Sequence, residues 1–399
     1  MPAPSPPAPE GSAAEVLRVA LRLGLTSFGG PIAHLGYFER AYVRERGWLS
    51  GEQFAALVGL CQILPGPTSS QVGFLIGLHR AGWRGALAAW LGFTLPSALL
   101  LYAGARLSAH AQGPLASATV HGLKLVAVPV VAQAVWSMAR RLCTDRSTWL
   151  IALAAAGLVF ASGGPDAQLV VLAAGLAAGL LWCDPASIPP GSAAQDVRPR
   201  TAWLALAAFT LLLGLSLFSW HPSPGGFALA QVFYRAGALV FGGGHVVLPL
   251  LRAALVPAGW LSDDAFLSGY GLAQAVPGPL FTVAAYLGAI AVTGAPTAGA
   301  LIALLAIFLP GLLLAVAGWS VWALLARHRQ LRAGIAGVNA AVVGILAAAL
   351  YTPVWLGAVH DWADVAVAAG ALLLLQTQRV PPLVVVVSCA AASIVRALA

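Results

Sequence analysis

Apolar runs of roughly 18 to 25 residues recur from Ala14 to the end of this chain, and each is long enough to cross a bilayer core as a helix. The composition agrees, because 60% of the residues are apolar and only 9% are charged. In lipid every backbone polar group must be bonded internally, which leaves helices or a closed barrel, and runs this long exclude the barrel. The sequence therefore predicts an all-α polytopic membrane protein.

Thirteen membrane spans are expected. They cover residues 14–33, 53–79, 85–106, 115–138, 148–163, 166–182, 201–220, 226–248, 264–293, 297–325, 332–356, 361–376 and 380–398. Residues 1–13 have neither basic residues nor an apolar core, so they are interpreted as a disordered tail rather than a signal peptide. The formal charge of +8 falls largely in short loops between spans, where it indicates topology rather than nucleic-acid binding.

The chain contains an internal duplication. FGGP at 28–31 returns as FGGG at 241–244, GWLS at 47–50 returns at 259–262, and QILPGP at 62–67 returns as QAVPGP at 274–279. Such duplication is typical of secondary transporters. We divide the chain into a first repeat at 14–182, a linker with one linking helix at 183–225, and a second repeat at 226–399. Six spans fall in each repeat, and the single linking span between them places the two repeats in opposite orientations, which makes an inverted repeat. If the PGP segments are instead re-entrant, eleven spans cross the membrane rather than thirteen.

Two PGP motifs are expected to break their helices, because proline removes amide donors in mid-span. The helix that restarts after each motif presents free N–H groups and a positive dipole end, which favour an anion. The first motif is Pro65, Gly66 and Pro67, and the second is Pro277, Gly278 and Pro279. Nearby side chains add donors: Gln62, Thr68, Ser69, Gln71 and Gln274. The alternative is a kink that only shapes packing.

The two FGG motifs form a second pair of candidate breaks. Phe28, Gly29, Gly30 and Pro31 match Phe241, Gly242, Gly243 and Gly244. Small residues here either leave backbone donors free for a ligand or allow close helix packing.

The charges deep within the predicted spans are all cationic. They are Arg22, Lys124 and Arg235, whereas every Asp and Glu lies at a span end, in a loop or in a tail. Each cation is expected to face a water-filled cavity or an anion, since an unpaired charge in lipid is costly. Snorkelling is the alternative for Arg22 and Arg235. The duplication places Asn339 opposite Lys124.

Titratable and redox-active residues give weaker signals. His34, His121 and His245 are candidates for proton coupling, although a lone histidine is more often structural. The four cysteines show no metal-ligand spacing, and no nucleotide-binding motif occurs. We expect no cofactor, no metal site and no catalytic residue.

With these paired motifs the sequence resembles the chromate ion transporter family in its long, two-domain form, over nearly the whole chain. The resemblance implies export of chromate from the bacterial cytoplasm, driven by the proton-motive force, and chromate resistance. It assigns motif positions to Phe28, Gly29, Gly30, Pro31, His34, Gln62, Pro65, Gly66, Pro67, Phe241, Gly242, Gly243, Gly244, Gln274, Pro277, Gly278 and Pro279. The second repeat departs from the pattern, because Gly244 stands where the first has Pro31.

The candidate substrate-binding set combines both lines of argument. Its members are Arg22, Gly29, Gly30, Pro31, His34, Gln62, Pro65, Gly66, Pro67, Thr68, Ser69, Gln71, Lys124, Arg235, Gly242, Gly243, Gly244, His245, Gln274, Pro277, Gly278, Pro279 and Asn339. The expected partners are chromate or a related oxyanion, the lipid bilayer of the bacterial inner membrane, protons as coupling ion and a second copy in a homodimer, without nucleic acid. Alternatives are a transporter of sulfate or another tetrahedral oxyanion, a passive channel, and a membrane-embedded enzyme.

Overall fold

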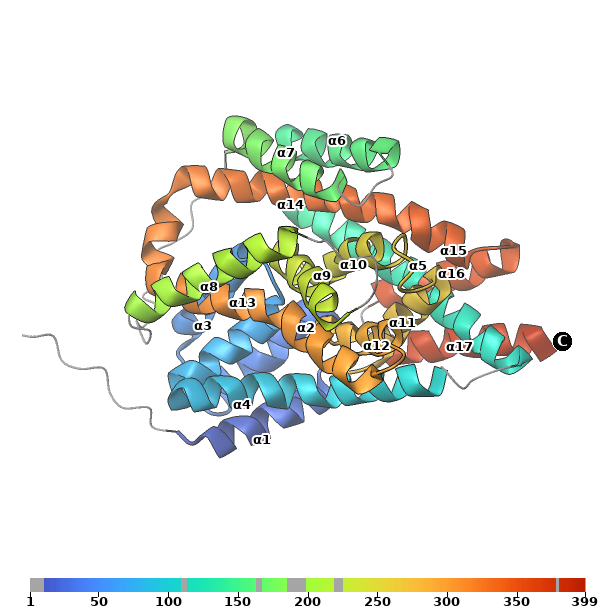
Figure 1. Cartoon of the computed structure of the whole chain (residues 1–399), viewed down its shortest axis with the longest axis horizontal. Helices are drawn as coiled ribbons and strands as arrows, with labels where there is room; N and C mark the ends of the chain where they lie inside the picture. Colours follow the sequence, from blue (N-terminus) through green and yellow to red (C-terminus); the bar gives the residue numbers. More distant parts are fainter. Residues whose placement is uncertain are drawn as a thin grey trace, which may run out of the picture.

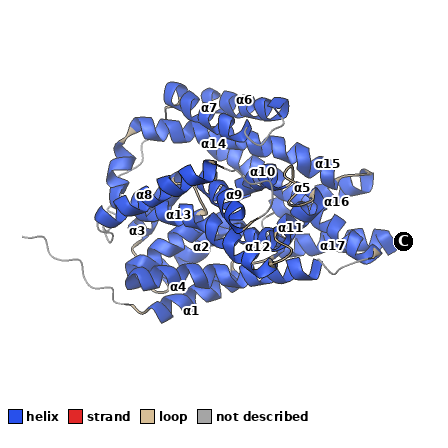
Figure 2. Cartoon of the chain, viewed as in Figure 1, coloured by secondary structure: helices blue, strands red, loops and turns tan. Residues whose placement is uncertain are grey.

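The computed structural model describes residues 11–108, 113–162, 167–184, 199–218, 225–377 and 380–398, without the side chains of residues 32, 162 and 321–327. All regular secondary structure in these ranges is helical (Figure 2). This confirms the all-α fold class. Most of the predicted tail and of the polar linker, residues 1–10 and 185–198, lies outside the described residues.

The helices follow the duplicated sequence. The first half contains α1 (Ala13–Thr26), α2 (Gly30–Phe38), η1 (Glu39–Arg44), α3 (Gly51–Ile63), α4 (Thr68–Ser108), α5 (Pro114–Leu142), α6 (Arg146–Ser162) and α7 (Ala167–Trp182). After the linking helix α8 (Pro199–Leu217), the second half contains α9 (Gly226–Leu239), η2 (Gly244–Val246), α10 (Val247–Leu255), α11 (Asp263–Ala275), η3 (Leu280–Thr282), α12 (Val283–Ala291), α13 (Pro296–Arg327), α14 (Arg329–Ala349), η4 (Leu350–Trp355), α15 (Leu356–Ala358), α16 (Trp362–Gln376) and α17 (Pro382–Leu398).

The long helix α4 is two helices joined by a sharp turn. Its backbone leaves helical geometry at Ala81 and at Gly82, where φ is 61°. The part after the turn corresponds to α13, and the part before it corresponds to η3 and α12. The two halves therefore repeat the same succession of helices.

Five helices within the described residues are long and apolar enough to cross a bilayer: α4, α5, α8, most of α13, and α14 with its continuation to Ala358. Four predicted spans, at 14–33, 53–79, 226–248 and 264–293, are instead interrupted. The helices that enter these interruptions are short: α1 and α9 have 14 residues each, and α3 and α11 have 13. A helix of that length spans about 21 Å, which is less than the hydrocarbon core.

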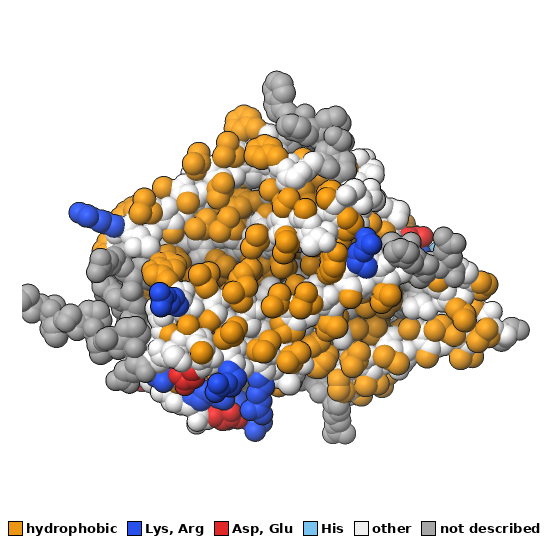
Figure 3. Space-filling model, turned by 60° about the horizontal axis from the view of Figure 1, so that its bottom comes forward, with side chains coloured by type: hydrophobic (Ala, Val, Ile, Leu, Met, Phe, Trp, Pro, Cys, Tyr) orange, Lys and Arg blue, Asp and Glu red, His pale blue; other side chains and the backbone are white. Residues whose placement is uncertain are grey.

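The outer surface of the described residues suits lipid. Leu87, Leu91 and Leu95 form an exposed stripe along α4, and α13 repeats it. The matching residues of α13 are Leu301, Leu305 and Leu309. In Figure 3 hydrophobic side chains cover most of the visible face, while charged side chains gather mainly along its lower edge. These features support a multi-pass membrane protein.

The two halves are interlocked. Helix α5 of the first half packs against α16 and α17 of the second, and α14 of the second half packs against α6 and α7 of the first (Figure 1). Glycines allow the backbones to touch: a Cβ on Gly337 of α14 would lie 2.1 Å from the carbonyl oxygen of Gly175 in α7. Each half therefore completes the packing of the other.

Candidate functional site

Four interruptions of the helices, which we call the four breaks, meet at the interface of the halves. They lie at residues 27–29, 64–67, 240–243 and 276–279. The amide of Gly66 donates to the carbonyl of Val240 at 2.7 Å, and the amide of Gly278 donates to the carbonyl of Ser27 at 2.9 Å. Ser27 and Val240 are the equivalent C-cap residues of α1 and α9. Each PGP break is thus bonded to the FGG break of the other half.

Both PGP glycines occupy backbone conformations and spaces that exclude a side chain. Gly66 has φ 120° and Gly278 has φ 103°. A Cβ on Gly66 would lie 2.8 Å from the Cα of Gly311, and one on Gly278 would lie 2.8 Å from the Oγ of Ser97. Ser97 and Gly311 follow the duplicated LP pair of α4 and α13. The close approach is therefore repeated in both halves.

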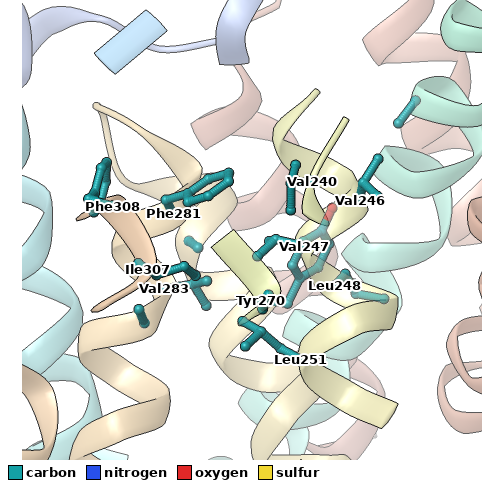
Figure 4. Packing of buried hydrophobic residues seen from close by; sticks show 14 of the residues in the cluster. Val240, Val246, Val247, Leu248, Leu251, Tyr270, Phe281, Val283, Ile307 and Phe308 are labelled. Atoms are coloured by element: carbon teal, nitrogen blue, oxygen red, sulfur yellow. The ribbon is translucent and has the colours of Figure 1, made fainter. Parts of the chain in front are cut away.

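Within each half, the two helices that restart after the breaks lie side by side. His34 of α2 places Nδ1 3.3 Å from the Oγ of Ser69 in the first turn of α4. In the second half Gly244 of η2 lies against Leu280 of η3. Figure 4 shows the buried side chains of this region, with Val240 between Phe281 and Val246 in the view. The positive dipole ends of the restarted helices consequently gather near one another.

Several buried polar atoms near the breaks have no hydrogen-bond partner within the described part of the chain. They are Ser27 Oγ, His34 Nε2, Ser70 Oγ, Gln71 Oε1, Thr94 Oγ1 and Gln274 Nε2. Buried polar groups are normally bonded, so these atoms are available for a hydrogen bond to a ligand or to water. The hydroxyls, the amide nitrogen of Gln274 and the imidazole nitrogen of His34 can donate to an oxyanion, whereas Gln71 Oε1 can only accept a hydrogen bond.

The segments around the four breaks carry no formal charge apart from any protonated histidine. Residues 26–38, 62–75, 239–251 and 274–287 contain no Asp, Glu, Lys or Arg. No carboxylate in these segments would repel an anion, and the helix ends provide the electropositive field. The arrangement can therefore bind an anion by backbone N–H groups and neutral donors.

The three deep cations have three different surroundings. Arg22 is exposed on α1, on the opposite side from the residues that pack on α4. Lys124 is buried and its Nζ lies 2.8 Å from Oδ1 of Asp264 at the start of α11, so its charge is compensated within the chain. Arg235 is half-buried and lines a small cavity of about 40 Å³ with Gln168 of α7.

The other predicted polar residues divide between the breaks and their periphery. Gln71 is buried and holds the first PGP break, because Nε2 donates to the carbonyls of Pro65 at 3.0 Å and Gly311 at 2.9 Å. Gln62 is exposed. Asn339 has a buried Oδ1 close to Gly242. His245 places Nδ1 2.7 Å from the hydroxyl of Tyr270.

Sequence reasoning did not select Ser27, Ser70, Thr94, Ser97 or Tyr270. Ser97 had a usable signal, because it directly follows the duplicated LP pair. Ser27 and Ser70 adjoin the selected residues Phe28 and Ser69 in the sequence, whereas Thr94 and Tyr270 carry no motif and are brought near the breaks only by the fold.

Comparison with known proteins gives a consistent result. The sequence profile of a family described as "Chromate transporter" matches residues 14–180 and 227–394. A "Chromate transport protein" of Pseudomonas aeruginosa is 28% identical over 340 residues, covering 82% of this chain and 78% of that protein. A "Probable chromate transport protein" of Synechococcus elongatus is 29% identical over 348 residues, covering 86% and 84%. A "Chromate transport protein" of Cupriavidus metallidurans is 28% identical over 349 residues, covering 86% and 83%. No solved structure matches the chain.

Proposed function

The chain belongs to the chromate transporter family, and from that premise we propose that it exports chromate across the bacterial inner membrane, driven by the proton-motive force, and so confers chromate resistance. The observation that carries the proposal is the crossed pairing of the four breaks. Transport across a membrane by alternating access requires a ligand site between two halves that can move relative to each other. The hydrogen bonds between breaks join one half to the other, and a helix begins after each of the four breaks.

In the proposed mechanism, chromate enters from the cytoplasmic side and binds at the four breaks. Its oxygens accept hydrogen bonds from free N–H groups of the restarted helices and from Ser70 and Gln274, which have unpartnered buried atoms. Neutral donors and helix dipoles hold a dianion less tightly than several paired guanidinium groups would, which lets the anion leave again. Arg22 and Arg235 then attract the anion from outside this centre rather than coordinating it.

Rocking of one half against the other would open the site to the outside. The bonds from Gly66 to Val240 and from Gly278 to Ser27 cross the interface, so we expect at least one of them to break during each cycle. Bound chromate would supply alternative acceptors for the released amides. This links the presence of substrate to the movement.

Uptake of radiolabelled chromate into respiring everted vesicles tests the proposal. We expect accumulation that a protonophore abolishes, and no change in the oxidation state of the accumulated chromium. Sulfate is added as a competitor, because a tetrahedral dianion of similar charge would occupy the same donors. Vesicles without the protein serve as the control. Equal accumulation in vesicles with and without the protein would refute chromate export, and reduction of chromate would point to an enzyme.

A further inference from the structure

A cluster of two histidines and a buried aspartate lies outside the four breaks, where α5, α16 and α17 meet near the end of the molecule that carries the C-terminus (Figure 1). His121 belongs to α5, His360 immediately precedes the N-cap of α16, and Asp364 lies in its first turn. The side chain of Asp364 is only 1% exposed. The first half thus contributes one of these groups and the second half contributes two.

The three side chains bring their potential metal-binding atoms within 4.8 Å of one another. His121 Nε2 lies 2.9 Å from Asp364 Oδ1, and His360 Nδ1 lies 3.8 Å from Asp364 Oδ2. Ligand atoms of a tetrahedral zinc ion, with bonds of about 2.0–2.2 Å, are separated by about 3.3 Å. Small side-chain rotations would therefore bring all three groups onto one ion.

We infer that His121, His360 and Asp364 form a binding site for a late first-row divalent metal ion such as Zn²⁺, with one position left open. Two imidazoles and one carboxylate are a common ligand set for such ions, and water takes the fourth position. The site is separate from the four breaks and does not depend on the transported anion.

The surrounding charges favour a cation. The charged groups around the cluster are Asp361, Asp364 and Arg396, which sum to −1 when both histidines are neutral. Lys124 lies one turn along α5 from His121, but Asp264 neutralises it.

The carboxylate of Asp364 is also held in position by other groups. Arg396 Nη1 donates to Oδ1 at 2.6 Å, and the backbone amide of His360 donates to Oδ2 at 2.9 Å. Outer contacts of this kind orient a metal-binding carboxylate. Arg396 also pairs with Asp361, so that guanidinium keeps a carboxylate partner if the metal takes Oδ1.

Zinc titration of the purified, chelator-stripped full chain in detergent tests the inference. We expect one Zn²⁺ per chain, and His360→Ala should weaken binding by about tenfold or more. His328→Ala, which removes an exposed histidine elsewhere in the chain, should leave the affinity unchanged. Because His360 is more than half exposed, its replacement is expected to leave the fold intact, whereas Asp364→Asn would also disturb the Arg396 contacts.

Cobalt substitution gives a readout that a merely structural cluster would not produce. Bound Co²⁺ should show visible absorption of nitrogen and oxygen ligation, and this signal should disappear in His121→Ala. The inference is wrong if zinc binds with the same affinity to the His360→Ala variant, if no stoichiometric binding occurs, or if the cobalt spectrum shows thiolate ligation by the cysteines.

Discussion

Lys124 illustrates how one contact changes the interpretation of a residue. A buried cation in a predicted membrane span suggests a bound anion, but Asp264 lies 2.8 Å away on α11. Asp264 stands at the start of a helix in the other half, where the sequence gives no reason to pair it with Lys124. At this scale sequence identifies a charge that needs a partner, and only the fold identifies the partner.

Replacing Asp264 should therefore destabilise the protein. Asp264→Asn leaves the largely buried ammonium of Lys124 without its counter-charge, and we expect the free energy of unfolding to fall by about 1–3 kcal/mol. Lys124→Met in the same chain should restore most of the loss, which thermal unfolding in detergent would measure. The control is Asp184→Asn, because its ion pair with Arg329 is highly exposed and should contribute less than about 1 kcal/mol. Unchanged stability in Asp264→Asn, together with loss of transport in Lys124→Met, would instead make Lys124 a substrate ligand.

The PGP glycines permit a second prediction at the residue scale. Gly66→Ala and Gly278→Ala should each lower the free energy of unfolding by about 1–3 kcal/mol, because both place a side chain at positive φ and in close contact with a neighbour, the backbone of Gly311 for the first and the hydroxyl of Ser97 for the second. Transport should fall in both variants. Gly214→Ala is the control, since that helical position in α8 has no neighbour within 4 Å of a new Cβ. Wild-type stability in Gly66→Ala would contradict the strained geometry.

At the scale of elements, the two PGP breaks are equivalent in sequence but are fastened differently. Gln71 reaches from α4 to the carbonyl of Gly311 in the other half as well as to Pro65. In the second half Thr282 Oγ1 donates at 2.6 Å to the carbonyl of Pro279, only three residues away. The side chain of Gln71 thus bonds the first break to the other half, whereas the side chain of Thr282 gives the second break only a local bond.

This difference predicts an order of effects. Gln71→Leu should destabilise the protein by about 1–3 kcal/mol, because it leaves two carbonyls without that donor, whereas Thr282→Val should cost about 1 kcal/mol. Denaturant unfolding of the two variants would compare them. Ser388→Ala is the control, since that exposed hydroxyl bonds only to the carbonyl of Val384 in its own helix. A larger loss in Thr282→Val than in Gln71→Leu would contradict the proposed asymmetry.

Proline chemistry made the breaks at 64–67 and 276–279 predictable, because a missing amide donor is visible in the sequence. The same sequence did not predict that each break bonds to the FGG segment of the opposite half. The cluster of His121, His360 and Asp364 was missed for a related reason, since α5 and α16 are far apart in the chain. A repeat shows which segments resemble each other, but contact between segments depends on how the halves pack.

At the scale of the whole molecule, that packing has a consequence for assembly. Helix α5 contacts α16 and α17 of the second half, and α14 contacts α6 and α7 of the first. The helices just named as partners of α5 and α14 belong in each case to the other half. The duplicated halves, although related in sequence, are therefore not expected to be independent folding units.

Cutting the chain within residues 185–198 should give two fragments that need each other. Expressed alone, each fragment exposes the interhelical faces of α5 or α14, and we expect degradation or aggregation. Expressed together, they should co-purify in about equal amounts through a tag on either one, since the buried contacts do not require a covalent linker. Adding Gly337→Leu, which places a side chain against the backbone of α7, should abolish co-purification while leaving the linker untouched. Stable, monodisperse fragments that do not associate would show that the halves fold alone, and the interlocked packing would then be wrong.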